Sequence, residues 1–332
     1  MKNLVEEQNK IDNMKAMVVS LNADISHLHS HYFVNVNLRN LENYLKKQNP
    51  EIVIIHSFFH LEYARVAQIL IKNHIKYYIE PHGSFMKAGL KKSKLKKTIA
   101  NATVFRRLLS CAYGYIYLNK GEQERSFYHT DHDVIIPNGI VYYKNVPNKS
   151  DTIKMYYIGR YDIHEKGIDT LIDALILLDK RGMSFTFDFY GNGSKDDVAF
   201  IVDRTTELKN IAVQVHGPIY DDEKDIILSH YNISVLLSRH EGLPMTILES
   251  WNYGNPCIVT PDTNMAHEAQ IEQIGWSVEL DAEKVAKIMS SAMYDYLKDK
   301  GCYIERCRKH ICSEYLWRRI AERSYRVLNS EK

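Results

Sequence analysis

The chain has 332 residues, 45% of them hydrophobic, and 43 basic against 41 acidic residues give a formal net charge of +2 at pH 7. This length and composition predict a globular protein of two domains that buries roughly three quarters of its unfolded surface. The balanced charge gives no global field for nucleic acid, no apolar run reaches the about 18 residues of a membrane span, and charged residues stand where a signal peptide needs an apolar core, so we expect a cytoplasmic location.

The cysteines predict reduced thiols. They are odd in number and form no C-x-x-C pair. The last three are spaced regularly, but a step of five residues on a helix turns each thiol by about 140° from the previous one, which does not suit zinc. The five are Cys111, Cys257, Cys302, Cys307 and Cys312.

The first half of the chain alternates helical and strand patterns. Residues 52–55 form a continuous apolar run of the kind that parallel sheets bury on both faces. The alternation therefore predicts an α/β domain. We expect helices over 1–13, 38–47, 61–73 and 97–112 and strands over 15–21, 52–55, 77–80 and 113–118, with 135–140 closing this half.

Histidines mark two of these strand ends. The sequence Pro81-His82-Gly83-Ser84 follows the strand at 77–80, and the carboxyl ends of strands are where open α/β sheets bind ligands. From the sequence alone, a ligand-binding His82 and a structural turn histidine are both compatible with this position. His56 and His60 flank another strand end and are candidates for facing an acceptor.

The segment Lys87–Arg107 is rich in lysine and arginine. One interpretation is a solvated helix face. The other is peripheral contact with anionic lipid, where each basic residue contributes up to about 1 kcal/mol.

A polar stretch over 141–154 is interpreted as a linker, and the second domain is expected to begin with a strand at 155–158. Gly159 and Arg160 follow directly, and Lys166 lies six residues after the arginine. The next expected helix, 168–180, has apolar residues at helical spacing and so packs on the core.

Three further strands are expected before the central motif, at 185–190, 213–216 and 233–237. Gly191 begins a G-x-G turn after the first of them, and Gly217 and Ile219 lie in the loop after the second. Loops after parallel strands line the ligand edge of a sheet.

Residues 238–260 have the pattern of a loop, a helix, a stop and a strand. Pro244 suits the first helical position and Gly254 ends the helix, which we place at 245–253. The first amides of this helix, on Met245, Thr246 and Ile247, are expected to be unpaired donors at a positive helix end, which is an anion site. Gly242 brings no side chain into the approach to that site.

Glu249 lies about one turn into the same helix and projects back toward its N-terminus. A carboxylate repels phosphate and suits hydroxyl groups. A sugar nucleotide supplies both kinds of group, with a diphosphate for the helix end and hydroxyls for Glu241 and Glu249.

The motif E-G-x-P-x-x-x-x-E, met by Glu241, Gly242, Pro244 and Glu249, resembles that of the retaining GT-B glycosyltransferases of the family-4 type. Gly-Arg followed by Lys-Gly, and the turns around His82 and Gly275, also stand where that family has them. The resemblance covers about Ile52 to Leu328. It implies an α/β GT-B fold, with two Rossmann-like domains facing across a cleft.

The implied domains are an acceptor-side domain of residues 1–148 with the C-terminal helix 314–332, and a nucleotide-sugar domain of residues 149–313. Family members usually begin with a strand and a Gly-Gly loop, which nothing before Ala16 matches. We therefore expect the first domain to lack its first strand and glycine loop.

The resemblance also implies roles for single residues. Arg160 and Lys166 would hold the diphosphate, Glu241 would contact the donor sugar, Glu249 the ribose, and His82 the transferring sugar. Two fixed cations at the leaving phosphate stabilise the transition state more than the ground state. The other expected donor-binding residues are Gly159, Gly191, Gly217, Ile219, Gly242, Leu243, Pro244, Met245 and Thr246.

Two other types of site are compatible with parts of the sequence. Asp131 and Asp133 form a D-x-D pattern with His129 nearby, but it precedes the linker and is far in order from the donor residues, so no metal is expected. Glu241 and Glu249 also resemble a glycosidase pair, whose carboxyls lie about 5 to 9.5 Å apart across the bond that is cleaved. A shared diphosphate pocket suits hydroxyl binding better.

The expected function is transfer of a hexose from a UDP-sugar to a glycan or lipid-linked acceptor, with retention and without a metal or other cofactor, in bacterial surface polysaccharide or glycoconjugate synthesis. A cytoplasmic enzyme, peripheral at the membrane, is expected. The alternatives are a nucleotide-sugar epimerase or phosphorylase of the same fold, and a non-catalytic binding subunit.

Overall fold

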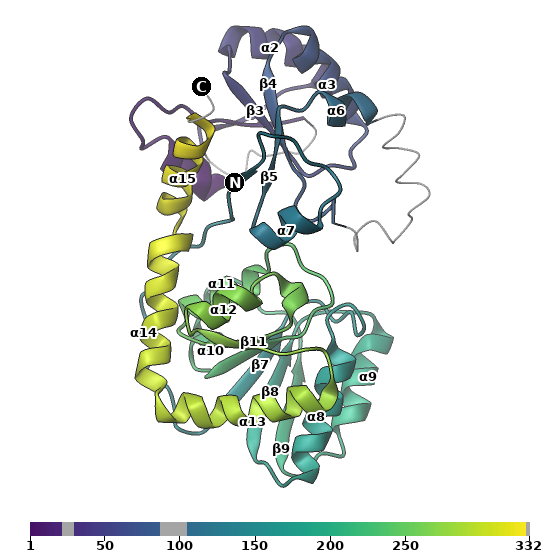
Figure 1. The fold of residues 1–332 in the computed structure, drawn as a ribbon, viewed down its shortest axis with the longest axis vertical. Coiled ribbons are helices and arrows are strands. Elements are labelled where there is room, and N and C mark those ends of the chain that lie inside the picture. The colour runs from purple at the N-terminus through teal and green to yellow at the C-terminus, as the bar shows by residue number, and fades with distance from the viewer. Residues whose placement is uncertain (22–29, 87–104, 330–332) are drawn as a thin grey trace. The chain divides into compact units, whose positions relative to one another are not determined.

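The computed structural model describes residues 1–21, 30–86 and 105–329 of the chain (Figure 1). It divides into two compact units, one made of Met1–Gly139 with Trp317–Lys332 and the other of Ile140–Leu316. Both are α/β units with parallel sheets. Most of the basic segment Lys87–Arg107 lies outside the described residues, and Arg106 and Arg107 at its end are exposed.

The first unit has a four-stranded parallel sheet in the order β3-β4-β5-β6. The register pairs His56 with Glu80, so the carboxyl ends of β3 and β4 lie side by side. A separate parallel pair joins β1 and β2. The strands are β1 (Val18–Ser20), β2 (Phe33–Asn35), β3 (Ile52–His56), β4 (Lys76–Glu80), β5 (Gly114–Tyr117) and β6 (Val134–Ile135).

Helices cover this sheet, and two come from opposite ends of the sequence. Helix α1 packs on α15, where Gln8 Nε2 donates to Ser324 Oγ at 2.9 Å. The core on another side of the sheet is aromatic, with Phe58, Phe85 and Phe105 buried in contact. The helices are α1 (Lys2–Gln8), α2 (Leu41–Gln48) after a 3₁₀ turn at Leu38–Asn40, α3 (Glu62–Lys72), α6 (Arg106–Ser110), α7 (Lys120–Arg125) and α15 (Trp317–Asn329).

The second unit has a six-stranded parallel sheet in the order β12-β11-β10-β7-β8-β9. The chain runs outward from β7 to β9 and then returns to the other side of β7 with β10. The strand order therefore reverses between β7 and β10, and ligands of open α/β sheets bind at the carboxyl ends of such strands. The strands are β7 (Lys154–Ile158), β8 (Phe185–Tyr190), β9 (Ile211–His216), β10 (Ile233–Leu236), β11 (Cys257–Val259) and β12 (Gly275–Ser277).

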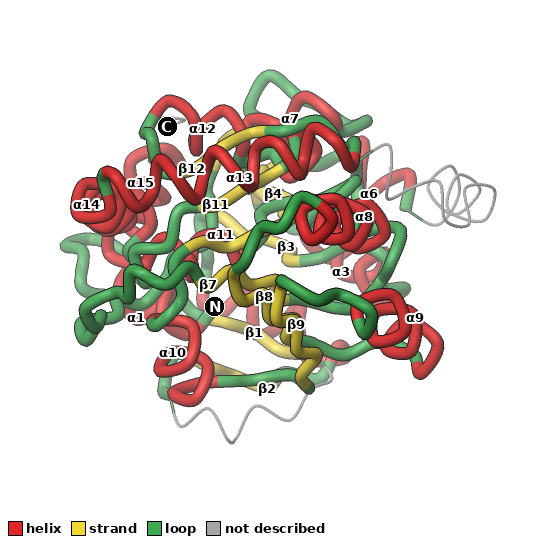
Figure 2. Tube along the Cα trace, turned by 90° about the horizontal axis from the view of Figure 1, so that it is seen from below, coloured by secondary structure: helices red, strands yellow, loops and turns green. Residues whose placement is uncertain are grey.

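The helices of the second unit pack on both faces of this sheet, as the end-on view shows (Figure 2). Helices α8 and α13 lie side by side. The helices of the second unit are α8 (Ile168–Lys180), α9 (Lys195–Thr205), α10 (Asp221–Ser229), α11 (Met245–Asn252), α12 (Ala266–Ile271), α13 (Ala282–Lys298) and α14 (Lys300–His310). A 3₁₀ turn lies at Pro261–Thr263 and a π-helical turn at Ile311–Tyr315.

Several expected elements are shorter than their patterns suggested. Helix α1 ends at Gln8 because the Asn9 side chain donates to Val5 O and Ala16 O, each at 2.8 Å, and turns the chain. The strand expected over 135–140 is limited to β6, since Pro137 has no N–H for a ladder. The last helix begins at Trp317 instead of Glu314, after the π-helical turn.

Within the parts of the chain described above, none of the helices has both the length and the apolar composition needed to span a bilayer.

Candidate functional site

The loop that enters α11 lies at the carboxyl end of β10 and is held by the loop after β11. Glu241 N donates to Asp262 O at 3.1 Å. The side-chain amide of Asn264 donates to Glu241 O at 2.7 Å and to Gly242 O at 3.1 Å. These bonds fix the backbone of the motif, so its side chains are presented in a defined way. Leu243 beside them is buried, at 8% exposure.

The start of α11 differs from the expectation in one donor. Pro244 is extended and Met245 is the first helical residue, but Ile247 N donates to Pro244 O at 3.0 Å. The prediction of a free amide at Ile247 is therefore wrong, because this amide donates to the Pro244 carbonyl and closes the first turn. Met245 and Thr246 carry the amides that helix geometry leaves without an intrahelical partner.

Lys166 and Glu241, which are far apart in the sequence, form an ion pair. Lys166 Nζ lies 2.6 Å from Glu241 Oε1, and Ser238 Oγ donates to the same oxygen at 2.7 Å. Both side chains are mostly buried, with 14% and 15% exposed. The loop after β7 and the loop after β10 thus bring a cation and a carboxylate together at the point where the strand order reverses.

Arg160 lies on the same sheet edge but points to other partners. Its guanidinium lies 3.3 Å from Glu165 and 4.0 Å from Asp162, and the side chain is 60% exposed. It lines an open hollow of about 550 Å³ together with Asn192 and Gly193 of the turn after β8. Arg160 is therefore a solvent-facing cation beside the glycine turn.

Glu249 is paired with Lys224 of α10, a residue that belongs to none of the sequence motifs. Lys224 Nζ lies 2.7 Å from Glu249 Oε1, with 22% and 20% of the side chains exposed. Burial raises the pKa of Glu249, and the Lys224 ammonium opposes that rise. In the sequence, Lys224 is marked only by the three acidic residues that precede it at the start of α10.

The expected glycines differ in what they do. A Cβ on Gly191 would lie 1.8 Å from Gly159 O, so the ends of β7 and β8 approach closely only because residue 191 has no side chain. A Cβ on Gly217 would meet nothing within 4 Å, so no packing requires a glycine there. Ile219 packs on the buried cluster that includes Tyr156 and Tyr190.

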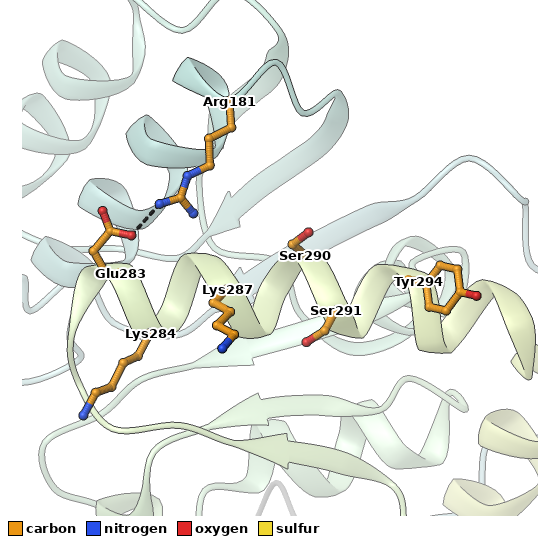
Figure 3. Close-up of a pocket in the computed structure, with 7 residues that line it drawn as sticks. All are labelled: Arg181, Glu283, Lys284, Lys287, Ser290, Ser291 and Tyr294. Carbon is orange, nitrogen blue, oxygen red and sulfur yellow. Dashed lines mark hydrogen bonds and ion pairs between the residues drawn. The ribbon is translucent and has the colours of Figure 1, made fainter.

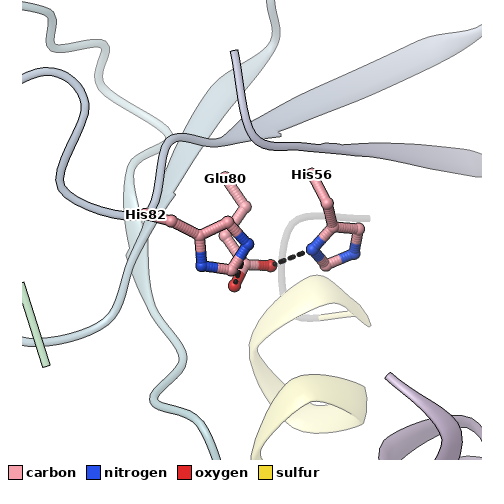
Figure 4. Close-up of side chains that lie close together, drawn as sticks. All are labelled: His56, Glu80 and His82. Carbon is pink, nitrogen blue, oxygen red and sulfur yellow. Dashed lines mark ion pairs between the residues drawn. The ribbon is translucent and has the colours of Figure 1, made fainter. Parts of the chain in front are cut away.

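In the first unit, Glu80 lies between two imidazoles (Figure 4). Its carboxylate oxygens are 3.0 Å from His56 Nδ1 and 3.5 Å from His82 Nε2. The His82 backbone has a φ of 49°, in the left-handed region that a histidine rarely adopts. Burial lowers the pKa of His82 while Glu80 opposes this, so the neutral imidazole is favoured.

A second carboxylate fixes the turn that carries His82. Glu122 of α7 is fully buried and accepts from Gly83 N at 2.5 Å and from Leu118 N at 2.7 Å. Burial raises the pKa of Glu122, and these two amides oppose the rise. Sequence reasoning missed Glu122, because its partner Gly83 is distant in the chain.

Among the described residues, His56, Glu80 and His82 are the group whose identity and spacing could hold a metal, with ligand atoms within 4.8 Å of one another. Glu80 lies within ion-pair distance of both imidazoles, while His56 Nδ1 is buried and makes no hydrogen bond to the described residues. Asp133 of the D-x-D pattern accepts from Tyr115 N and from Thr130 Oγ1, each at 2.9 Å, and lies 3.3 Å from His129. Asp133 thus joins its loop to β5.

Another open hollow, of about 630 Å³, lies over α13 and the end of α8 (Figure 3). It is lined by polar side chains and Tyr294, and Arg181 pairs with Glu283 at its edge. None of its lining residues belongs to the motifs, so we do not include it in the candidate site.

Residues 142–309 match the family described as glycosyl transferases group 1, and the chain belongs to that family. The matched range contains Arg160, Lys166, Glu241 and Glu249, and with them all the contacts described for the second unit.

Individual relatives agree with this assignment. The GtfA subunit of UDP-N-acetylglucosamine–peptide N-acetylglucosaminyltransferase from Streptococcus parasanguinis is 25% identical over 202 residues, which are 57% of this chain and 38% of that protein. The structure of TarM matches with a TM-score of 0.66 and 20% identity, over 88% of this chain and 58% of TarM. The chain thus spans less than two thirds of the length of each of these two relatives.

Alr3699/HepE from Anabaena, solved in complex with UDP, matches over 99% of this chain and 95% of its own, with a TM-score of 0.71 and 11% identity. At these identities the solved structures establish the fold, which is that of the GT-B glycosyltransferases.

Proposed function

We propose that this protein is a retaining, metal-independent glycosyltransferase that moves a hexose from a UDP-sugar to an acceptor hydroxyl. The observation that carries the proposal is the Lys166–Glu241 pair, 2.6 Å apart, which joins the two motifs of the chain at the reversal of the strand order. Family membership supports transfer from an activated sugar. The UDP in the Anabaena structure supports UDP as the nucleotide.

The proposed chemistry follows from the charges of the second unit. When the nucleoside diphosphate leaves, negative charge accumulates on its β-phosphate, and Lys166, Arg160 and the first amides of α11 are the donors assigned to it. Glu241 is assigned to the sugar hydroxyls and Glu249 to the ribose. For His82 we propose the role in sugar binding that the family resemblance implies.

For the acceptor, we propose a glycan or lipid-linked saccharide in bacterial surface polysaccharide or glycoconjugate synthesis, with peripheral contact at a membrane. The name of the Streptococcus relative adds peptide as an acceptor class to be assayed. An EDTA-treated sample that keeps full transfer would support metal independence, and a loss restored by Mg²⁺ or Mn²⁺ would contradict it.

The first experiment is a thermal-shift titration with UDP, GDP and ADP. A ligand at 100 times its Kd stabilises the folded state by about 2.7 kcal/mol, so we expect a selective rise of the Tm with UDP. Folded protein whose Tm is unchanged by all three nucleotides would contradict the proposal.

Variants then test the site. Glu249→Ala should weaken UDP binding, and Lys166→Ala should lower turnover by orders of magnitude, because it removes a cation from the developing charge. Lys284→Met, which breaks the exposed pair with Glu279, is the control and should behave like wild type. UDP binding without release of UDP from any UDP-sugar would instead favour a non-catalytic subunit.

A further inference from the structure

Glu249 has a fixed neighbour that its motif does not include. Lys224 Nζ lies 2.7 Å from Glu249 Oε1, and the hydrogen bond uses only that one carboxylate oxygen. The other carboxylate oxygen takes no part in this ion pair and can accept from another donor. A ribose hydroxyl is such a donor.

Beside the Lys224 contact, a second hydrogen bond joins α10 to the residue that follows α11. The neighbouring residue Asp225 accepts from Tyr253 Oη at 2.5 Å. Glu249 and Tyr253 are four residues apart and therefore lie on one face of the helical chain, as neighbours one turn apart. Two adjacent residues of α10, Lys224 and Asp225, thus contact residues one turn apart near the end of α11. These contacts fix the position of the Glu249 carboxylate relative to α10.

The charges around Glu249 show why a lysine is needed. The carboxyl is largely buried, and the Asp225 carboxylate adds repulsion that favours its neutral form. Lys224 is the cation that offsets both. A neutral carboxylic acid accepts fewer hydrogen bonds than a carboxylate, so the pair also keeps the group a strong acceptor.

We propose that Lys224 is a positioning residue for nucleotide binding, which holds Glu249 ionised and oriented toward the ribose without itself contacting the phosphates. The inference rests on the proposed function, because it assigns the ribose to Glu249. It differs from the roles of Lys166 and Arg160, which are assigned to the diphosphate.

The test compares uridine with UDP. Isothermal titration gives the Kd of each for wild type, Lys224→Met and Lys224→Arg, with Lys284→Met as the matched control for loss of a lysine–glutamate pair. Lys224→Met should raise the Kd of uridine and the Kd of UDP by a similar factor, about tenfold, since both ligands contain the ribose. Lys224→Arg keeps the charge and should recover most of the loss.

The outcomes separate the possibilities. A loss confined to UDP would show that Lys224 contacts phosphate and would overturn the positioning role, as would wild-type affinities in Lys224→Met. If wild type binds neither probe, the proposed function fails and this inference with it, whereas binding by wild type and equally by Lys224→Met overturns the inference alone. Thermal unfolding of each variant shows that it is folded, and Lys224→Arg decides the case should Lys224→Met not fold.

Discussion

At the scale of single residues, both acids of the motif are neutralised by lysines from elsewhere in the chain. Lys166 pairs with Glu241 and Lys224 with Glu249. In the proposed function, a diphosphate would compete with Glu241 for Lys166, so donor binding would require the exchange of one anion for another. A sugar hydroxyl that donates to Glu241 would compensate for the lost ion pair. We therefore expect nucleotide and sugar to bind more tightly together than either does alone.

Glu122 leads to a residue-scale prediction in the first unit. Glu122→Gln keeps the size of the side chain, but its NH₂ group cannot accept from Gly83 N or Leu118 N. One buried amide then lacks a partner, which should lower the free energy of unfolding by about 1–3 kcal/mol. Because the turn carries His82, transfer should fall further than UDP binding.

Chemical denaturation, UDP titration and turnover measure these three effects. Ser126→Ala is the matched control, since the Ser126 hydroxyl, just after α7, donates to Glu122 O at 2.7 Å and its loss leaves both amide bonds of the Glu122 carboxylate in place. Equal losses of stability and turnover in both variants would show that Glu122 has no particular importance for His82.

At the scale of elements, helix α8 is placed by a glycine at each end. Gly167, at its start, has a φ of +65°, and a Cβ there would lie 2.2 Å from Leu237 O, just after β10. Gly182, after its end, has a φ of +74° with nothing within 4 Å of a Cβ. Gly182 N donates to Asp179 O and Met183 N to Leu178 O, the two bonds of a Schellman motif.

Substitution of these two glycines distinguishes the cost of a left-handed φ from the cost of a steric clash with the backbone. Gly182→Ala should cost about 1 kcal/mol for its left-handed φ alone. Gly167→Ala adds a backbone clash and should cost roughly 2–4 kcal/mol, and it should weaken UDP binding because it displaces Lys166. Gly301→Ala, inside α14 with free space around it, should be neutral or slightly stabilising.

Urea unfolding of the three variants gives the comparison. A Gly167→Ala cost no larger than that of Gly182→Ala would mean that α8 does not approach the chain after β10 closely. The position of Lys166 beside Glu241 would then not depend on that approach.

Elements with strong local signals were predictable from the sequence. Helix α8 has the expected bounds, 168–180, because an apolar stripe lies between two left-handed glycines. Helix α11 ends at Asn252, one residue before the expected end, since Pro244 and Gly254 limit it on both sides. The π-helical turn at Ile311–Tyr315 was not predictable, because Ile140 N, distant in sequence, donates to Tyr315 O at 2.7 Å.

For the whole molecule, the α/β class followed from the β/α alternation, and the GT-B fold from the resemblance of the motifs to those of a known family. The sequence also identified Lys166 and Glu241, which the structure brings together. It did not identify Lys224, Glu122 or Glu80, each of which has a partner on another element. Residue spacing reports a shared helix or strand, whereas these contacts depend on how loops and helices pack around a sheet.

Lys149 is a further residue of this kind, because it lies in the stretch expected to be a polar linker and is only 5% exposed. Its ammonium donates to Tyr231 O at 2.8 Å, to Asn255 Oδ1 at 2.6 Å and to Ser229 O. Three oxygens, from α10, the turn after it and the loop between α11 and β11, thus replace water. Burial nevertheless lowers the pKa of Lys149 to about 7, from 10.5 in the unfolded chain.

The sign of the pH dependence follows from this difference. Between about pH 7 and 10.5 the unfolded chain holds a proton that folded protein has released, so the stability of the fold rises with pH in that window. Relative to Lys149→Met, which has no such proton, the free energy of unfolding of wild type should increase by about 2 kcal/mol from pH 7 to pH 9. Denaturant unfolding at several pH values measures the difference, with the exposed-lysine variant Lys144→Met expected to follow wild type. A difference between wild type and Lys149→Met that stays constant over this range would show that the three oxygens keep the buried ammonium charged.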